Sequence, residues 1–253
     1  MTEGYDFTNR TALVTGAASG IGAATARWLD RHGIGKLVLV DRDGDGLEVL
    51  DLSCEVERHA ADVADEAFWA TLEPKLGALD HAVVNAGIGL GGTFTELSFE
   101  DWRKVMAVNL DGAFLTLATA LRAIRKRENG GSAVVTASVT GIKPVPGTGA
   151  YGVSKAAVAH MARMAAAENA AHRIRVNAIA PGGVDTAIWN SPDLQAQFAE
   201  HGREAVIAKM GQTTPRGQFA TADELARDIG YLLSDAAANV TGTVLTSDGG
   251  YTL

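Results

Sequence analysis

The 253-residue sequence has only one cysteine, Cys54. A single cysteine excludes an intramolecular disulfide and is typical of a reducing compartment, so we expect a cytoplasmic location. Cys54 itself is interpreted as a small apolar packing residue. The first residues, MTEGYDFTNR, have no basic start followed by an apolar core, which argues against a secretory signal peptide.

Positive charge is also scarce: 22 Lys and Arg face 30 Asp and Glu, giving a formal net charge of -8. Nucleic acids and anionic lipids attract proteins mainly by electrostatics, and an acidic chain opposes that attraction. No uninterrupted apolar run has the length of a transmembrane helix. We therefore expect neither a nucleic acid nor a membrane as a partner.

Histidines are few and scattered. The six of them show no metal-ligand spacing, so we expect no metal site. All are interpreted as structural or surface residues, namely His32, His59, His81, His160, His172 and His201.

Strand-like and helix-like segments alternate along nearly the whole chain. The pattern predicts strands at Thr11 to Thr15, Lys36 to Val40, Val56 to Ala61, His81 to Val84, Ala133 to Ala137, Arg175 to Ala180 and Val240 to Thr246. It predicts helices at Gly20 to Arg31, Glu66 to Leu76, Phe99 to Arg127, Gly152 to Ala171 and Ala222 to Leu233. Such alternation favours a single α/β domain, a Rossmann-like doubly wound parallel sheet with helices on both faces.

One segment interrupts this alternation. Residues 186–218 contain Pro192, Pro215 and several glycines around a predicted helix from Leu194 to Met210. Irregular segments of this kind often close over a site, so we interpret it as a substrate lid.

The first strand leads directly into a glycine-rich turn, TGAASGIG at Thr15 to Gly22. Gly16, Gly20 and Gly22 permit a tight turn and a close backbone approach, and Ser19 and Ile21 lie between them. The amide groups at the start of the following helix attract a phosphate. The spacing differs from the common G-x-G-x-x-G fingerprint, so the turn alone is weak evidence of a dinucleotide site.

Asp41 ends the second strand about 20 residues beyond this turn, where a carboxylate can accept hydrogen bonds from the adenosine ribose. The same charge repels the 2′-phosphate of NADP. Arg42 follows and is able to recruit that phosphate, but the turn has no Lys or Arg to assist it. We therefore predict NAD as the cofactor, with NADP as the less favoured alternative.

A tyrosine and a lysine lie four residues apart in YGVSK, Tyr151 to Lys155. On a helix this separation places both side chains on one face. An ammonium beside a phenol favours the phenolate, so we expect Lys155 to lower the pKa of Tyr151 and make it a general acid or base. Ser138 follows the fifth predicted strand, where its hydroxyl can hold a substrate oxygen.

Together these motifs resemble the short-chain dehydrogenase/reductase family from Thr11 to about Gly250. The resemblance rests on TGAASGIG, NAG at Asn85, VNLDGAF around Asn109, Ser138, YGVSK, PGGVDT at Pro181 and the terminal TGTVLTSDGG. Val84 departs from it, because many relatives have a second asparagine there. The stretch between Asp41 and Asp62 is also compact, leaving room for only a short second helix.

The resemblance implies roles for these residues. Tyr151 transfers the proton, Lys155 lowers its pKa and binds the nicotinamide ribose, Ser138 orients the substrate, and Asn109 holds a water of the proton relay. Asp62 and Val63 flank the adenine, and Val184 and Thr186 meet the nicotinamide carboxamide. The expected cofactor set is Gly16, Ser19, Gly20, Ile21, Gly22, Asp41, Arg42, Asp62, Val63, Asn85, Ala86, Gly87, Tyr151, Lys155, Pro181, Gly182, Val184 and Thr186.

The substrate is expected to be a lipophilic neutral ketone or secondary alcohol, because the segments expected around it are mostly apolar and show no concentration of Arg or Lys. These segments are Ile88 to Gly92, the residues after Ser138 and the lid, with Phe198 and Met210. The expected substrate contacts are Ser138, Thr140, Ile142, Tyr151, Gly183 and Trp189.

Two alternatives remain open. One is an NADP-linked 3-oxoacyl reductase of the same family, with Arg125, Lys126 and Arg127 facing an acidic carrier. The other is a non-catalytic nucleotide-sensing or scaffold protein, which would not need the intact set of Ser138, Tyr151 and Lys155. We also expect a homotetramer, since the helix after Tyr151 is apolar on nearly every side and one face alone is enough to cover the sheet.

Overall fold

The computed structural model describes residues 5–189 and 192–253 and has seven parallel strands in one sheet. The strand order is β3-β2-β1-β4-β5-β6-β7, which confirms the expected doubly wound parallel sheet. The strands are β1 Thr11–Thr15, β2 Lys36–Asp41, β3 Glu55–Ala60, β4 His81–Val84, β5 Gly131–Thr136, β6 Ile174–Pro181 and β7 Val244–Ser247.

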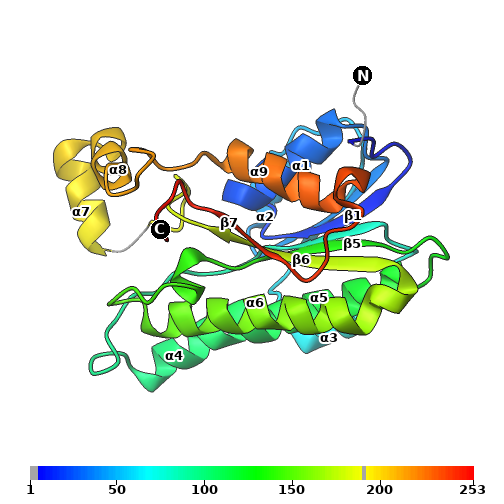
Figure 1. Cartoon of the computed structure of the whole chain (residues 1–253), viewed down its shortest axis with the longest axis horizontal. Coiled ribbons are helices and arrows are strands. Elements are labelled where there is room, and N and C mark those ends of the chain that lie inside the picture. Colours follow the sequence, from blue (N-terminus) through cyan, green and yellow to red (C-terminus); the bar gives the residue numbers. More distant parts are fainter. Residues whose placement is uncertain (1–4, 190–191) are drawn as a thin grey trace.

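Helices cover both faces of the sheet (Figure 1). One face carries α1 Gly20–Arg31, α2 Gly44–Glu48 and α9 Ala222–Leu233. The other carries α3 Glu66–Leu72, α4 Phe99–Met106, α5 Gly112–Ile124 and α6 Gly149–Asn169. The five-residue α2 agrees with the short second helix expected between Asp41 and Asp62.

Alternate strand residues supply two separate hydrophobic cores. In β1, Leu13 packs in the core beneath α5 and α6, whereas Ala12 and Val14 pack in the core beneath α1 and α9. Val83 and Val84 of β4 divide in the same way. Because both of their faces are buried, strands such as β2 and β4 appear in the sequence as continuous apolar runs rather than alternating ones.

The segment predicted to form a lid differs from the sequence prediction. Instead of one helix from Leu194 to Met210, two helices are present, α7 Pro192–His201 and α8 Arg203–Gly211. Gly202 separates them with φ of +80°, a left-handed conformation that a continuous helix cannot contain. The single-helix prediction is therefore wrong. In Figure 1 both helices lie at the upper left of the view, to one side of α1, α2 and α9.

Two further boundaries differ from the predictions by four residues each. Helix α3 ends at Leu72 rather than Leu76, because Pro74 lacks the N–H group that would continue the helix. Strand β7 begins at Val244 rather than Val240, after Gly242 with φ of +74°.

Helix α4, a π-helical turn at Ala107–Asp111 and α5 form one continuous helix, Phe99–Ile124. By length and composition alone it is apolar enough to cross a membrane, which the sequence analysis did not expect. Asp111 interrupts its apolar residues, so no unbroken run is visible in the sequence. Residues such as Leu117, Ala120 and Ile124 are buried in the core, and this burial accounts for the apolar composition.

Candidate active site

Several of the predicted site residues lie at or just after the carboxyl ends of strands. Gly16 follows β1, Asp41 ends β2, Asn85 follows β4 and Ser138 comes shortly after β5. In a parallel sheet these ends share one edge. The strand order reverses between β1 and β4, which is where ligands bind in open α/β sheets.

The glycine-rich turn depends on glycine at three positions. Gly16 and Gly20 have φ of +66° and +53°, which L side chains rarely adopt. A Cβ atom on Gly22 would lie 2.0 Å from the carbonyl oxygen of Gly16. The backbone therefore folds back closely on itself at the start of α1, and a side chain at position 22 would not fit there.

The N-terminus of α1 has the properties of an anion site. Ser19 stands at the N-cap position but makes no side-chain capping bond, and the first turn has no acidic residue. The first N–H groups of a helix have no partner within the helix and carry its positive dipole end. These features fit the pyrophosphate of a dinucleotide.

Asp41 is tied to this turn through its carboxylate. One oxygen accepts the N–H of Ala18 at 2.9 Å, and the other accepts the N–H of Asp43 at 3.0 Å. A carboxylate oxygen accepts more than one hydrogen bond, so both remain able to accept from a ribose hydroxyl. Arg42 is exposed beside it.

The residues predicted to flank the adenine are held by local contacts. The Asp62 carboxylate accepts the N–H of Ala64 at 2.9 Å, and the Asp62 side chain is exposed to solvent. Val63 is buried, and its carbonyl accepts the indole N–H of Trp69 at 2.8 Å. Because the side chain of Val63 packs inward against Gly112, a ligand would meet mainly its backbone.

Asn85 joins three strands. Its amide group donates to the carbonyls of Thr15 and Gly16, and its side-chain oxygen accepts the hydroxyl of Thr136. Ala86 also donates its N–H to the hydroxyl of Thr15. These bonds fix the loop after β4 against the glycine turn.

Tyr151 and Lys155 lie one turn apart on α6, as the sequence predicts. The Nζ atom of Lys155 donates to the carbonyl oxygen of Thr136 at 2.8 Å and lies 5.7 Å from the centre of the Tyr151 ring. Lys155 and Ser138 are both buried. Ser138 lies near enough to Tyr151 to lower its pKa, so these three of the four predicted catalytic side chains form one cluster.

The pKa of Tyr151 shifts in the direction opposite to the one expected from the sequence. Burial raises the pKa of Tyr151, and the hydrogen bond with Ser138 only partly opposes the rise. Burial also lowers the pKa of Lys155 to about 8. Desolvation disfavours the charged form of both groups, and the Lys155 ammonium bonds a carbonyl rather than the phenol oxygen.

Asn109 lies in the π-helical turn Ala107–Asp111, where the sequence predicted an uninterrupted α-helix. Its side-chain oxygen accepts the N–H of Ile88 at 2.8 Å, and its amide donates to the carbonyl of Ile88 and the hydroxyl of Ser154. Asn109 therefore ties the loop after β4 to α6. Single π turns are frequent at functional sites.

The segment after β6 lies over the glycine turn. A Cβ atom on Gly20 would lie 3.3 Å from the side chain of Thr186. Pro181 ends β6, Gly182 packs against Asp248, and Val184 is buried. The structure thus brings the last group of predicted cofactor residues to the same edge as the first.

Arg203 of α8 holds this segment and was not predicted. Its guanidinium donates to the Asp185 carboxylate at 2.6 Å and to the carbonyl of Thr186 at 2.9 Å, and it lies over the Phe198 ring. It links both lid helices to the residues beside the glycine turn. A lone arginine in an irregular segment gives no sequence signal for such a role.

Two of the predicted substrate contacts belong to a packed aromatic cluster. The Gly183 backbone packs directly on the Phe219 ring, which stacks on Trp189 with centroids 5.6 Å apart. The indole N–H of Trp189 donates to the carbonyl of Val184 at 2.7 Å. Its N–H group is therefore bonded to the backbone after β6 rather than directed toward a ligand.

Two exposed apolar side chains lie beside these segments. Ile142 is 48% exposed and Ile188 is 41% exposed. Ile188 was not among the predicted contacts, but a Cβ atom on Gly89 would lie 3.0 Å from it, so it meets the loop after β4. Thr140, by contrast, donates its hydroxyl to Ser138 at 3.1 Å.

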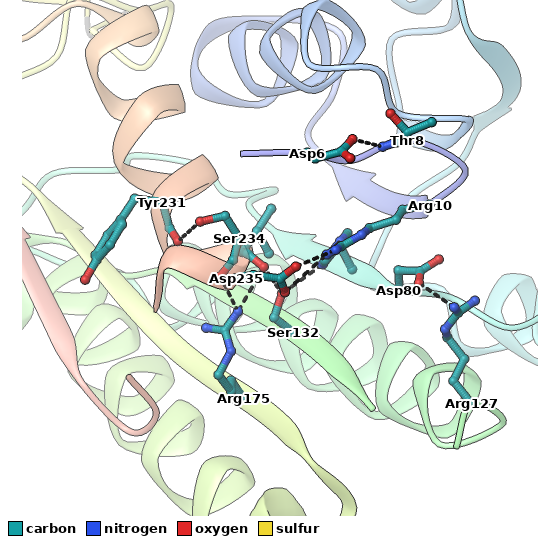
Figure 2. Close-up of polar contacts among 12 residues, drawn as sticks. Asp6, Thr8, Arg10, Asp80, Arg127, Ser132, Arg175, Tyr231, Ser234 and Asp235 are labelled. Atoms are coloured by element: carbon teal, nitrogen blue, oxygen red, sulfur yellow. Dashed lines mark hydrogen bonds and ion pairs between the residues drawn. The ribbon is translucent and has the colours of Figure 1, made fainter. Parts of the chain in front are cut away.

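A second polar network lies at the opposite edge of the sheet (Figure 2). There Arg10 binds Asp235, Arg127 binds Asp80, and Arg175 donates to the carbonyls that end α9. His81 is buried among these groups, where burial first and then the nearby arginines lower its pKa to about 3.

Among residues 5–189 and 192–253, no three His, Cys, Asp or Glu side chains group as metal ligands do.

Comparisons with known proteins agree over nearly the whole length. A family model described as Enoyl-(Acyl carrier protein) reductase matches residues 16–252. Cis-4-hydroxycyclohexanecarboxylate dehydrogenase of Sinomonas cyclohexanicum is 38% identical, covering 98% of this chain and 99% of its own. Cyclohexanol dehydrogenase of Acinetobacter sp. (strain SE19) is 34% identical, covering 97% and 96%. The crystal structure of a short-chain type dehydrogenase/reductase from Mycobacterium marinum has a TM-score of 0.85 and 30% identity, covering 98% and 97%.

Proposed function

The chain belongs to the short-chain dehydrogenase/reductase family, and on that premise we propose that it is an NAD-dependent oxidoreductase interconverting a secondary alcohol and a ketone. The observation that carries the proposal is the cluster of Ser138, Tyr151 and Lys155 beside the glycine-rich turn. A protein that only bound a nucleotide would not need a half-buried phenol with a hydroxyl and an ammonium around it.

Each of these side chains has a defined task. Tyr151 gives its proton to the substrate oxygen in reduction and takes it back in oxidation. Ser138 donates a hydrogen bond to the same oxygen. Lys155, with Thr136 holding its Nζ atom, keeps a positive charge near the phenol and binds the nicotinamide ribose. Asn109 fixes the loop after β4 and helps to hold a water on the proton path.

The cofactor residues fit a dinucleotide. The α1 N-terminus would hold the pyrophosphate, Asp41 the adenosine ribose, Asp62 and Val63 the adenine edge, and Thr186 the nicotinamide end. When bound, the nicotinamide supplies the hydride acceptor or donor. The Asp41 carboxylate supports NAD over NADP, because it repels a 2′-phosphate.

The substrate is proposed to be a neutral, lipophilic secondary alcohol or ketone carried on a ring. Exposed Ile142 and Ile188 support an apolar wall, and Arg203 of α8 is engaged by Asp185. The names of the two curated relatives, acting on cyclohexanol and on a hydroxycyclohexane carboxylate, support a ring alcohol.

An NADP-linked 3-oxoacyl reductase is less well supported. The basic residues expected to face an acidic carrier follow α5 and precede β5, so they lie at the sheet edge opposite the Ser138 and Tyr151 cluster. Each also has an intramolecular partner: Arg125 bonds Asn169, Lys126 the carbonyl of Leu76, and Arg127 Asp80.

We further propose a cytoplasmic homotetramer. On α6, Val153 and Met164 are 41% and 50% exposed, while Val158 and Ala162 on another face are buried against the sheet. A second apolar face of this kind supports packing against a symmetric partner helix.

The test is a screen of cyclic and open-chain alcohols and ketones, following NADH absorbance, with purified wild-type protein and Tyr151→Phe. The variant keeps the ring and loses only the hydroxyl. Turnover should fall by a factor of about 10² to 10⁴, while NAD affinity measured by calorimetry stays the same. Nearly full turnover by Tyr151→Phe would refute the proposed mechanism.

A further inference from the structure

The Ser138 hydroxyl accepts two hydrogen bonds from one neighbour, Thr140. The backbone N–H of Thr140 donates to the Oγ atom of Ser138 at 3.2 Å, and the Oγ1 hydroxyl of Thr140 donates to the same atom at 3.1 Å. A serine hydroxyl has one hydrogen and two lone pairs. With both lone pairs occupied, Ser138 can make further hydrogen bonds only as a donor.

Local backbone geometry fixes this pair. Ser138 is extended, with φ of -168° and ψ of 157°, and caps the short 3-10 turn Val139–Gly141. A Cβ atom on Gly141 would lie 2.6 Å from the backbone of Lys155 and Ala156, so this turn is seated directly on α6. The hydroxyl of Thr140 is thereby held at a constant position relative to both Ser138 and Tyr151.

We propose that Thr140 is a positioning residue that makes the Ser138 hydroxyl an obligate donor toward the oxygen undergoing reaction. This inference rests on the proposed alcohol and ketone chemistry. A ketone oxygen carries lone pairs and no hydrogen, so it can be held only by donors, and an alkoxide formed during oxidation has the same requirement. Thr140 keeps the Ser138 hydroxyl oriented as a donor, which is the orientation that binds both the ketone oxygen and the alkoxide oxygen.

The contact with Tyr151 supports this direction. Ser138 opposes the rise in the pKa of Tyr151, which is the effect expected of a hydroxyl that donates to the phenolate. Without the Thr140 hydroxyl, one lone pair of Ser138 would be free, and its hydrogen could turn away from the reacting oxygen. The expected loss is therefore in the chemical step rather than in binding.

The test compares Thr140→Val with Thr140→Ser. Valine keeps the shape and removes the hydroxyl, whereas serine restores it. We expect Thr140→Val to lower kcat for ketone reduction about 10-fold, equivalent to ~1.4 kcal/mol, with the KM for NADH unchanged and the pH midpoint of alcohol oxidation raised. Thr140→Ser should regain most of the lost kcat and the wild-type pH midpoint.

A double-mutant cycle with Ser138→Ala separates positioning from packing. In the Ser138→Ala background, Thr140→Val should cause no further loss, because the hydroxyl it orients is already absent. An equal loss in both backgrounds, wild-type kcat in Thr140→Val, or no recovery in Thr140→Ser would overturn the inference. The proposed function fails on a different result, namely full activity of Tyr151→Phe and Ser138→Ala.

Discussion

A Cβ atom on Gly87 would lie 3.3 Å from the Nζ atom of Lys155 and 3.2 Å from the side-chain oxygen of Asn109. Gly87 is exposed to solvent, but a side chain at this position would press on both groups. Without a side chain at position 87, the Lys155 ammonium can lie close to this loop while it donates to the carbonyl of Thr136. The absence of a side chain at position 87 is thus part of the site's geometry.

Gly87→Ala should therefore displace the ammonium of Lys155 by a few tenths of an ångström and lower kcat/KM about 10-fold, since small misplacements at a reacting group are costly. The fold should persist in circular dichroism. Gly77→Ala is the matched control, because a Cβ atom at Gly77 meets nothing within 4 Å. Equal rates for the two variants would show that the Gly87 contact is unimportant.

Asp41→Ala should narrow the preference for NAD over NADP by a factor of at least about 10, by removing both the ribose contact and the repulsion of the 2′-phosphate. The measurement is kcat/KM for each cofactor. Asp45→Ala, in the exposed first turn of α2, is the control for a nearby loss of negative charge. A wild-type protein that already favours NADP would contradict the assignment of Asp41.

Lys155→Ala should weaken NAD binding and raise the pH at which alcohol oxidation begins. Burial already raises the pKa of Tyr151, and loss of the nearby positive charge removes a factor that favours the phenolate. The measurements are NAD titration by calorimetry and steady-state rates across pH. Lys75→Ala, an exposed lysine, is the control. An unchanged pH profile together with unchanged affinity would eliminate the proposed role.

The buried His81 should cause the free energy of unfolding to fall as the pH is lowered. Ser132 donates to the carbonyl of Leu233, so its oxygen accepts from Nδ1 of His81, and the other ring nitrogen faces Arg10. Burial holds the pKa of His81 at about 3 in the fold, against an ordinary value of 6.5. The unfolded chain therefore binds more protons between these values, and stability is complete above pH 6.5 and falls as the pH drops toward 3.

The measurement is urea unfolding at several pH values, comparing wild type with His81→Asn. Asparagine can still donate to Ser132 but does not titrate, so its free energy of unfolding should fall less steeply with acid. The difference in slope should approach about 1.4 kcal/mol per pH unit in the middle of the range. Parallel curves for the two proteins would contradict the assignment.

Sedimentation should give a mass four times that of the 26.3 kDa chain. Met164→Glu, which adds a charge to the exposed face of α6, should shift the protein toward smaller species, because an interface disfavours an unpaired buried charge. Lys75→Glu is the matched control. A stable wild-type monomer at micromolar concentration would refute the tetramer.

The sequence by itself determined the layout of the domain. Continuous apolar runs such as Leu37 to Val40 indicate strands that are buried on both faces. Glycines at positions 16, 20 and 22 indicate the tight turn that precedes α1. The four-residue spacing of Tyr151 and Lys155 likewise fixes their common helix face before any fold is known. These properties are local, so they are visible in a single chain segment.

Only the tertiary structure decided the features that depend on contacts between distant segments. The π turn at Asn109 exists where the loop after β4 meets α6, and the split of the lid at Gly202 accompanies the bonds of Arg203 to Asp185 and Thr186. The direction of the Tyr151 pKa shift is of the same kind. Spacing along a helix predicts a neighbouring charge, but desolvation depends on everything packed around the phenol, and that is a property of the folded chain alone.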